Sequence, residues 1–362
     1  MKRAIYLIVS AAVPATIAVR YLSPSRTILL FLLSCAAMVP LATLLSEATE
    51  QLALRTGSTV GALLNVTFGN AGELVIGFFA LRSGLIDVVK ASISGSILVN
   101  LLLTMGTAML VGGIRHKTLC FNSLRARTQT TTLALAAIAL VFPAAYARLA
   151  GGPGLADREA GLSLAFAVIL ALTYALGLLF TLHTHRDVLS TKKREVKEGA
   201  PEWPAWKALA ALAISAGVIG WVGEVLVDSL EPVARRFGLS NFFIGLVVVA
   251  VAGNAAESVS AVRAALRNRM DLSVGISAGS SIQIALFVAP ALVIASRWIA
   301  PRPLDLVFTP VELLALVVAV GITVLIAGDG ESNWLEGVQL IVVYLLIAVM
   351  VFSLPPSATQ GR

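Results

Sequence analysis

Two short stretches decide how this chain folds: GNAGE at residues 69–73 and GNAAE at residues 253–257. They lie 184 residues apart, and the same offset aligns further polar and glycine positions without a gap. Chance similarity between apolar segments favours matches of Leu, Ala and Val, so it does not explain shared Asn, Glu, Asp and Gly. The chain therefore contains an internal duplication. The further matches are Gly61 with Gly245, Asp87 with Asp271, Gly95 with Gly279, and Ser96 with Ser280.

The composition is that of an integral membrane protein. Of the 362 residues, 58% are hydrophobic and 13% are charged, whereas soluble domains have roughly 45–50% and about 25%. A helical span needs roughly 20 mostly apolar residues, and the apolar segments lack the period-2 alternation of barrel strands. The sequence predicts eleven helical spans. They are Ala4–Tyr21, Thr27–Leu54, Val60–Leu81, Val88–Gly112, Thr128–Ala147, Gly161–Leu182, Ala205–Ser229, Asn241–Leu266, Leu272–Ile294, Leu304–Ala327 and Trp334–Phe352.

The predicted fold class is an all-α membrane protein with about 11 transmembrane helices. One N-terminal helix precedes two repeats of five helices, and because five is odd the second repeat inserts upside down relative to the first, as in many secondary transporters. The predicted division is residues 1–24 for the N-terminal helix, 25–182 for the first repeat, 183–204 for a cytoplasmic basic linker and 205–362 for the second repeat.

The basic residues predict an orientation in the membrane. The net charge is +7, but Lys and Arg gather in short loops, as the positive-inside rule describes, so we do not expect a nucleic-acid partner. The loops after the fourth and sixth spans are both basic. The chain is expected to be a multi-pass protein of the cell membrane, with its N-terminus in the cytoplasm and its C-terminus outside. Arg235 and Arg236 are exceptions, because they fall on the outer side.

Glu73 and Glu257 lie near the middle of apolar spans. A carboxylate there costs about 2.5–3.5 kcal/mol even on lenient scales, so it is expected to face a partner, a cavity or an ion. Inverted repeats bring equivalent positions together near the midplane, and Ca²⁺ binds six to eight oxygens from carboxylates, amides, carbonyls and water. The predicted metal ligands are Glu73, Glu257, Asn70 and Asn254. The predicted lining residues of the ion pathway are Thr67, Ser96, Asn100, Ser280, Ser281 and Gln283.

The same two carboxyl groups predict a link to protons. An apolar environment and a like-charged neighbour favour the protonated form of an empty site, whereas a bound dication favours the ionised pair. Metal and protons then compete for one place. Glu50 and Glu224 lie nearer to span ends, where they are either part of a proton path or simply solvated. For Glu73 and Glu257 the alternative is a pair of separate helix-packing hydrogen bonds.

Two segments carry a family resemblance. Residues 64–74 (LNVTFGNAGEL) and 279–290 (GSSIQIALFVAP) resemble the two repeats of the cation/proton exchanger (Ca²⁺/H⁺ antiporter) family of the calcium/cation antiporter superfamily. The resemblance implies Ca²⁺/H⁺ exchange with Glu73 and Glu257 as the central acidic pair. The sequence departs from the family pattern at four positions, and the added charge of a lysine and the lost polar lining favour Na⁺ or K⁺. These positions are Lys90, Val99, Ala250 and Ser258.

The predicted function is a secondary active antiporter that exchanges Ca²⁺ for H⁺ by alternating access, with a Na⁺(K⁺)/H⁺ antiporter of the same fold as the alternative. An uncoupled channel and an intramembrane enzyme are the other classes. The sequence has no phosphate-binding Walker loop and no motif of a hydrolase or metalloprotease, so we expect no enzyme activity. We expect no cofactor. The expected partners are the transported Ca²⁺ and H⁺ and the membrane lipid.

Overall fold

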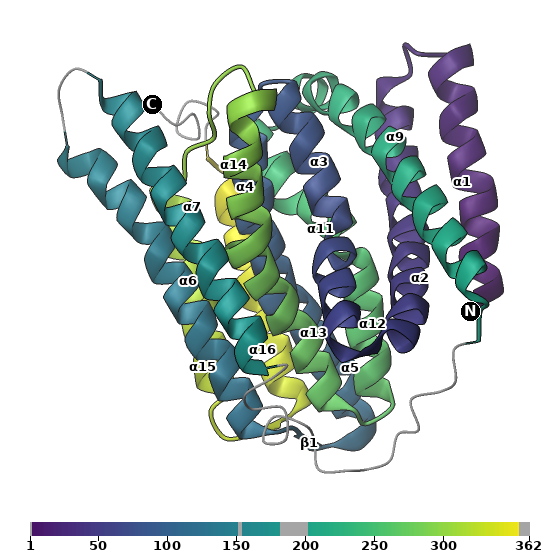
Figure 1. The fold of residues 1–362 in the computed structure, drawn as a ribbon, viewed down its shortest axis with the longest axis vertical. Coiled ribbons are helices and arrows are strands. Elements are labelled where there is room, and N and C mark those ends of the chain that lie inside the picture. Colours follow the sequence, from purple (N-terminus) through teal and green to yellow (C-terminus); the bar gives the residue numbers. More distant parts are fainter. Residues whose placement is uncertain (1, 151–153, 182–201, 355–362) are drawn as a thin grey trace.

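The computed structural model describes residues 2–150, 154–181 and 202–354, with side chains throughout except at residues 2–10, 57–63, 65 and 66. Nearly all of these residues are helical, and the two strands have two residues each (Figure 1). The predicted all-α class is confirmed. The predicted linker at residues 183–204 lies almost entirely outside the described residues.

The first half of the chain follows the predicted order of helices. Its elements are α1 (Lys2–Leu22), α2 (Thr27–Gly69), α3 (Ala71–Arg82), α4 (Ile86–Leu98), the π-helix η1 (Val99–Thr104), α5 (Met105–His116), β1 (Leu119–Cys120), α6 (Ser123–Leu149) and α7 (Leu155–Leu179).

The second half repeats this order with more interruptions. Its elements are α9 (Ala205–Phe237), α10 (Asn241–Phe243), the π-helix η3 (Ile244–Val249), α11 (Ala250–Gly253), α12 (Ala255–Leu266), α13 (Met270–Gln283), the π-helix η4 (Ile284–Val288), α14 (Ala289–Ile299), α15 (Pro310–Ile326), β2 (Glu331–Ser332) and α16 (Trp334–Phe352). Strand β2 pairs antiparallel with β1 at the lower end of the molecule in Figure 1.

The packing of the helices shows the internal two-fold relation. With the offset of 184 residues, α3 corresponds to α12, α4 to α13, α5 to α14, α6 to α15 and α7 to α16. Exchanging each helix for its equivalent preserves the contacts between helices. Helix α5 packs on α12, and their equivalents α14 and α3 also pack on each other. The same holds for α16 on α5 and α7 on α14, and the equivalent helices α6 and α15 pack on each other. Helices η1 and η4 are π-helical at corresponding positions. The duplication read from the sequence is therefore present in three dimensions.

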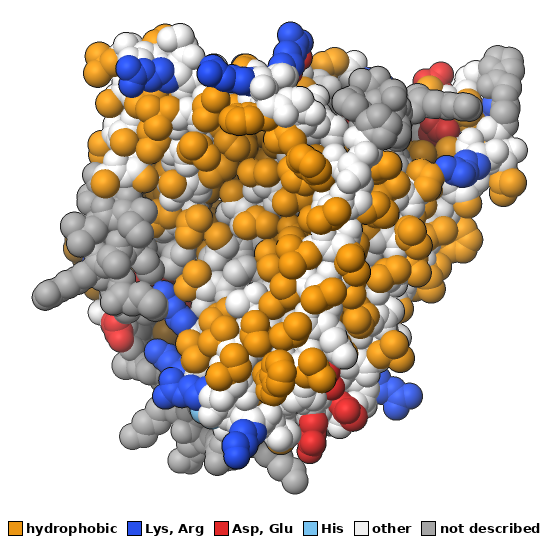
Figure 2. Space-filling view, turned by 180° about the vertical axis from the view of Figure 1, so that it is seen from behind, with side chains coloured by type: hydrophobic (Ala, Val, Ile, Leu, Met, Phe, Trp, Pro, Cys, Tyr) orange, Lys and Arg blue, Asp and Glu red, His pale blue; other side chains and the backbone are white. Residues whose placement is uncertain are grey.

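The outer surface is suited to lipid. Figure 2 shows hydrophobic side chains over the middle of one face, with Lys and Arg toward its upper and lower edges. Large apolar side chains such as Leu176, Leu325 and Leu346 are 65%, 80% and 64% exposed. A water-soluble protein rarely exposes so large an apolar area, so these side chains face the hydrocarbon core of a bilayer.

The described residues give a count of the helices that could cross a membrane. Among them, seven helices are long and apolar enough to cross a membrane, or eight if the bent pair Asn241–Gly253 and Ala255–Leu266 forms one span. Two shorter apolar helices cover Ala11–Leu22 and Pro310–Ile326. The count of eleven stays a prediction. One boundary differs from the expected pattern, because residues 55–59 remain helical within α2 and the interruption comes later, at Asn70.

Two helix crossings are so close that only glycine is possible at the contact. A Cβ on Gly95 of α4 would lie 2.2 Å from the carbonyl oxygen of Leu246, and a Cβ on Gly245 would lie 2.9 Å from that of Val88. At the crossing of α5 and α16, a Cβ on Gly337 would lie 2.5 Å from the carbonyl oxygen of Gly106. Small residues allow this close backbone approach between helices in membranes.

We predict that Gly95→Ala destabilises the protein. The new methyl group meets backbone that cannot rotate away, and such overpacking costs about 1–3 kcal/mol. The thermal midpoint of the purified protein in detergent micelles should fall. Gly217→Ala is the matched control, because no atom lies within 4 Å of the added methyl group and Ala is the better helix former. Equal midpoints for the two variants would contradict the packing described here.

Candidate functional site

Each repeat contains a helix that is broken at an asparagine. Helix α2 ends at Gly69 and α3 begins at Ala71, and α11 ends at Gly253 and α12 begins at Ala255. Asn70 and Asn254 stand between them with φ of −116° and −92°, and the second pair is bent by 54°. A helix that ends leaves its last carbonyl oxygens without helical partners, so both breaks present backbone oxygens inside the protein.

The two glutamates follow directly after the breaks. Glu73 and Glu257 lie in the first turns of α3 and α12, where the helix dipole favours negative charge. Glu73 Oε1 is 3.3 Å from the position that a Cβ on Gly253 would occupy, so the carboxylate of the first repeat touches the break of the second. Glu257 follows Gly253 by four residues, in the first turn of α12, so the Glu73 carboxylate lies against the turn that carries Glu257. The structure thus brings the two acidic side chains together.

Amide side chains tie each break to the other repeat. Asn254 donates from Nδ2 to Ser96 Oγ at 2.8 Å and accepts at Oδ1 from Asn100 Nδ2 at 2.6 Å. In the opposite sense, Asn70 of the first repeat donates to Gln283 Oε1 of the second. These bonds hold both helix breaks against the helices that lead into the π-helical segments η1 and η4.

Several oxygens of this cluster have no hydrogen-bond donor. Asn70 Oδ1, Asn100 Oδ1, Glu73 Oε1 and Glu257 Oε2 are buried without a partner among the described residues. Unpaired buried acceptors are costly and call for an explanation such as a bound ion or water. Among the described residues, no three side chains of His, Cys, Asp or Glu lie close enough together to hold a metal ion, so a cation here would need amide and backbone oxygens besides the two carboxylates.

A cavity leads from one end of the molecule to this cluster. It has a volume of about 590 Å³, and its walls include α2, α12 and α13. It reaches the short connection between α12 and α13 at the lower end in Figure 1, and we call it the lower cavity. Glu257 belongs to its described lining, whereas Glu73 does not. The polar or flexible positions that line its inner part are Glu50, Gly69, Glu257, Ser260, Ser280 and Gln283.

The remaining predicted residues are spread around this centre. Ser281 is buried and donates to the carbonyl oxygen of Ser277 at 3.0 Å. Thr67 is exposed in the last turn of α2, and Glu50 is exposed at the wall of the lower cavity. Glu224 is half-buried on α9 and is not among the described lining residues of the cavity.

One polar contact of the cluster was missed in the sequence. Ser258, where the family pattern has His, donates to the carbonyl oxygen of Asn254 at 2.9 Å, and its hydroxyl group also meets Thr104 Oγ1. Thr104 stands at the end of η1. No local pattern links two residues 154 positions apart, so only the three-dimensional arrangement reveals this pair.

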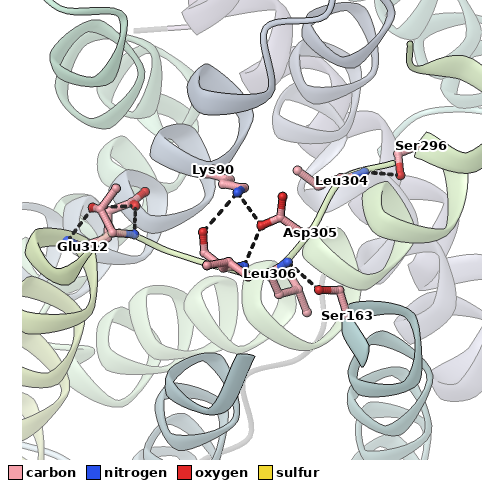
Figure 3. A network of polar contacts seen from close by, with 9 residues as sticks. Lys90, Ser163, Ser296, Leu304, Asp305, Leu306 and Glu312 are labelled. Atoms are coloured by element: carbon pink, nitrogen blue, oxygen red, sulfur yellow. Dashed lines mark hydrogen bonds and ion pairs between the residues drawn. The ribbon is translucent and has the colours of Figure 1, made fainter. Parts of the chain in front are cut away.

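The ammonium group of Lys90 is not directed at the helix breaks at Asn70 and Asn254. Figure 3 shows its ammonium group beside the loop between α14 and α15. There it forms an ion pair with Asp305 and donates to the carbonyl oxygen of Val307 at 3.0 Å. One turn along α4, Ser94 donates to the buried Glu312 at 2.9 Å. The charge of Lys90 is thus paired with that of Asp305, so it gives little support to a preference for Na⁺ or K⁺.

The family model described as "Sodium/calcium exchanger protein" matches residues 26–183 and 207–353, which together cover both repeats. The chain belongs to the sodium/calcium exchanger family. The resemblance inferred from the two repeated motifs is thereby confirmed.

Relatives of this family member cover nearly its whole length. A Ca²⁺/H⁺ antiporter of Aphanothece halophytica is 43% identical over 90% of each chain. The Ca²⁺/H⁺ antiporter ChaA of Bacillus subtilis is 40% identical over 98% of this chain and all of its own. The solved structure of native YfkE is 37% identical, covers 97% of this chain and 100% of its own, and superposes with a TM-score of 0.83. That of the H⁺/Ca²⁺ exchanger CAX, at 18% identity, shares the fold with a TM-score of 0.74 over 99% of this chain and 93% of its own.

We predict that Lys90 and Asp305 stabilise this exchanger-family protein as a pair. In a double-mutant cycle of Lys90→Met and Asp305→Asn, the two losses in stability should be non-additive by about 1 kcal/mol or more, because each single variant leaves the other charge partly buried and unpaired. Thermal midpoints in detergent micelles measure this. The exposed pair Arg235–Glu231, with side chains 78% and 52% accessible, should show weaker coupling. Additive losses at Lys90 and Asp305 would refute the pairing.

Proposed function

We propose that this protein is a secondary active antiporter that exchanges Ca²⁺ for H⁺. The observation that carries the proposal is the meeting of Glu73 and Glu257, one from each repeat, at two helix breaks whose neighbouring oxygens lack donors. The relatives named Ca²⁺/H⁺ antiporters, at 43% and 40% identity over almost the full length, support the choice of ions.

The donor set suits a hard divalent cation. Glu73 and Glu257 supply two negative charges, Asn70 and Asn100 supply free amide oxygens, and the helix ends supply carbonyl oxygens. Ca²⁺ accepts this mixture at six to eight positions, completed by water. The first-choice ligands are therefore the two glutamates with Asn70. Asn254 has its amide oxygen occupied by Asn100, so it acts by holding the break in place.

Proton coupling follows from the same two charges. Two carboxylates that share a site disfavour each other's ionised form, so the site without a cation takes up protons to remove that repulsion. A bound Ca²⁺ removes it instead. Each passage of the site from one membrane face to the other then carries either the metal or protons, which is the condition for exchange.

The centre is open toward the lower end of the molecule, because the lower cavity reaches Glu257 from there. Helices α4 and η3 lie in backbone contact at Gly95 and Leu246. We assign the lower end to the cytoplasm, because α1 and α9 begin there and the basic connection from α5 to α6 lies there (Figure 1). In this assignment the N-terminus is cytoplasmic, and α16 ends at the outer face.

Flux measurements distinguish Ca²⁺ from the alternative cations. In everted vesicles with an imposed pH gradient, Ca²⁺ should dissipate the gradient and Na⁺ or K⁺ should not. The alternative rested on a loss of polar lining and on the charge of Lys90, and this charge is paired with Asp305. A response to Na⁺ without one to Ca²⁺ would reverse the choice of ion while leaving the site in place.

We predict that Glu73→Gln and Glu257→Gln each reduce Ca²⁺/H⁺ exchange to the background rate while the protein remains folded. Glutamine keeps the size of the side chain but removes the charge and the exchangeable proton. Exchange is measured in proteoliposomes, and folding by size-exclusion profile and thermal midpoint. Glu231→Gln, at the surface of α9, is the control and should retain activity. Full activity in both test variants would exclude these carboxylates as the ion site.

We also predict competition between protons and Ca²⁺. Lowering the pH on the side from which Ca²⁺ binds, with the opposite side held constant, should raise the apparent KM for Ca²⁺ and leave the limiting rate nearly unchanged. The sign follows because protonated carboxyl groups do not bind the metal, so affinity is present at high pH and is lost as pH falls. A KM independent of pH would show that protons bind elsewhere.

A further inference from the structure

The lower cavity is unexpectedly basic for a route to a cation site. Its described lining includes four arginines and two glutamates, one of which is Glu257 itself. None of the four has an ion-pair partner among the described residues, and Arg263 Nε is buried without any hydrogen-bond acceptor there. Arg267 and Arg269 are exposed, whereas Arg125 and Arg263 are half-buried, and a half-buried charge without an ion-pair partner favours the binding of an anion. The four are Arg125, Arg263, Arg267 and Arg269.

These side chains converge from three directions. Glu257, Ser260, Arg263 and Arg267 all line the cavity from α12 and its end. At a rise of 1.5 Å per residue, Arg263 and Arg267 stand about 9 Å and about 15 Å from Glu257 along this helix. Arg269 follows in the connection to α13, and Arg125 reaches in from α6. The Arg125 guanidinium lies 3.3 Å from the Cβ position of Gly275, so the bare backbone of α13 makes room for it.

The duplication does not repeat these charges in the first half of the chain. At the offset of 184 residues, Arg263, Arg267 and Arg269 correspond to Phe79, Ser83 and Leu85, whereas the glutamate and asparagine of the centre are shared. The positive-inside rule explains why basic residues gather at this end. It does not explain why they line the cavity instead of the outer surface of the helices.

We propose that the lower cavity binds a phosphate-bearing anion between these arginines. The planar guanidinium fork matches phosphate oxygens in a bidentate manner, and a cavity of about 590 Å³ lies within the usual range of roughly 300–1,000 Å³ for small-molecule sites. A free phosphate compound and a lipid headgroup present the same chemistry. The four arginines are not among the proposed metal ligands, although Glu257 lines the same cavity, so the proposal stands whether or not the transported cation is Ca²⁺.

Binding is tested on the full-length protein without Ca²⁺. In phosphatidylcholine nanodiscs, titration calorimetry with inorganic phosphate should show saturable binding to the unaltered protein. The variant Arg263→Gln with Arg267→Gln should weaken it about tenfold or more, the loss expected for removal of charge-assisted bonds. The control variant carries Arg235→Gln and Arg236→Gln, which remove the same number of charges in the last turn of α9, outside the described lining of the cavity. It should bind phosphate as the unaltered protein does. Thermal midpoints confirm that all variants are folded.

A second arm identifies the source of the phosphate group. If a lipid headgroup occupies the site, nanodiscs containing phosphatidylglycerol should weaken the binding of inorganic phosphate by competition, and the Arg263/Arg267 variant should retain less phosphatidylglycerol through purification. If a free anion is the ligand, phosphate binds equally in both lipids. The proposal is overturned if the unaltered protein neither binds phosphate nor retains phosphatidylglycerol, or if the cavity variant and the control variant behave alike.

Discussion

A carboxylate inside a bilayer needs a hydrogen-bond donor, a cation or a polar cavity beside it, and the rest of this structure depends on that requirement. Glu73 and Glu257 each lie at a helix N-terminus, and Gly253 leaves room for the Glu73 side chain. Amide oxygens from neighbouring helices complete the polar environment. A continuous helix offers no free backbone groups at its middle, because every carbonyl is bonded within it. The two breaks at Asn70 and Asn254 therefore create the polar environment that the carboxylates need.

The inverted duplication makes those breaks mutually supporting. Asn254 is held by Ser96 and Asn100 from the first repeat, and Asn70 is held by Gln283 from the second. Each break also has bonds within its own repeat, such as that from Asn254 Nδ2 to the carbonyl oxygen of Ala250 at 2.8 Å. The bonds between the repeats are formed only when both halves pack together, so they connect the integrity of the fold with that of the proposed ion site.

The sequence predicts the repeated parts of this arrangement much better than the unique parts. Glu73, Glu257 and their asparagines stand out because the motif occurs twice at one offset, and a charge within an apolar span has few explanations. The pair Lys90–Asp305 and the contact of Thr104 with Ser258 join residues 215 and 154 positions apart without a repeated counterpart. No periodic pattern in the sequence predicts such pairs. The predicted span boundary at residues 55–59 is wrong, because α2 continues to Gly69; polar residues at a helix end and within a helix look alike in sequence.

The two halves differ chemically around the centre, although symmetry relates the repeats. Ser46 is exposed and lines the lower cavity, but its counterpart in the second repeat, Leu230, is buried at 1% exposure. An opening related to the lower cavity by the internal symmetry would bring Leu230 into contact with water, at a cost of about 1.5–3 kcal/mol if its side chain became fully exposed. We therefore expect the two orientations of the transporter to differ in free energy, with the lower opening favoured.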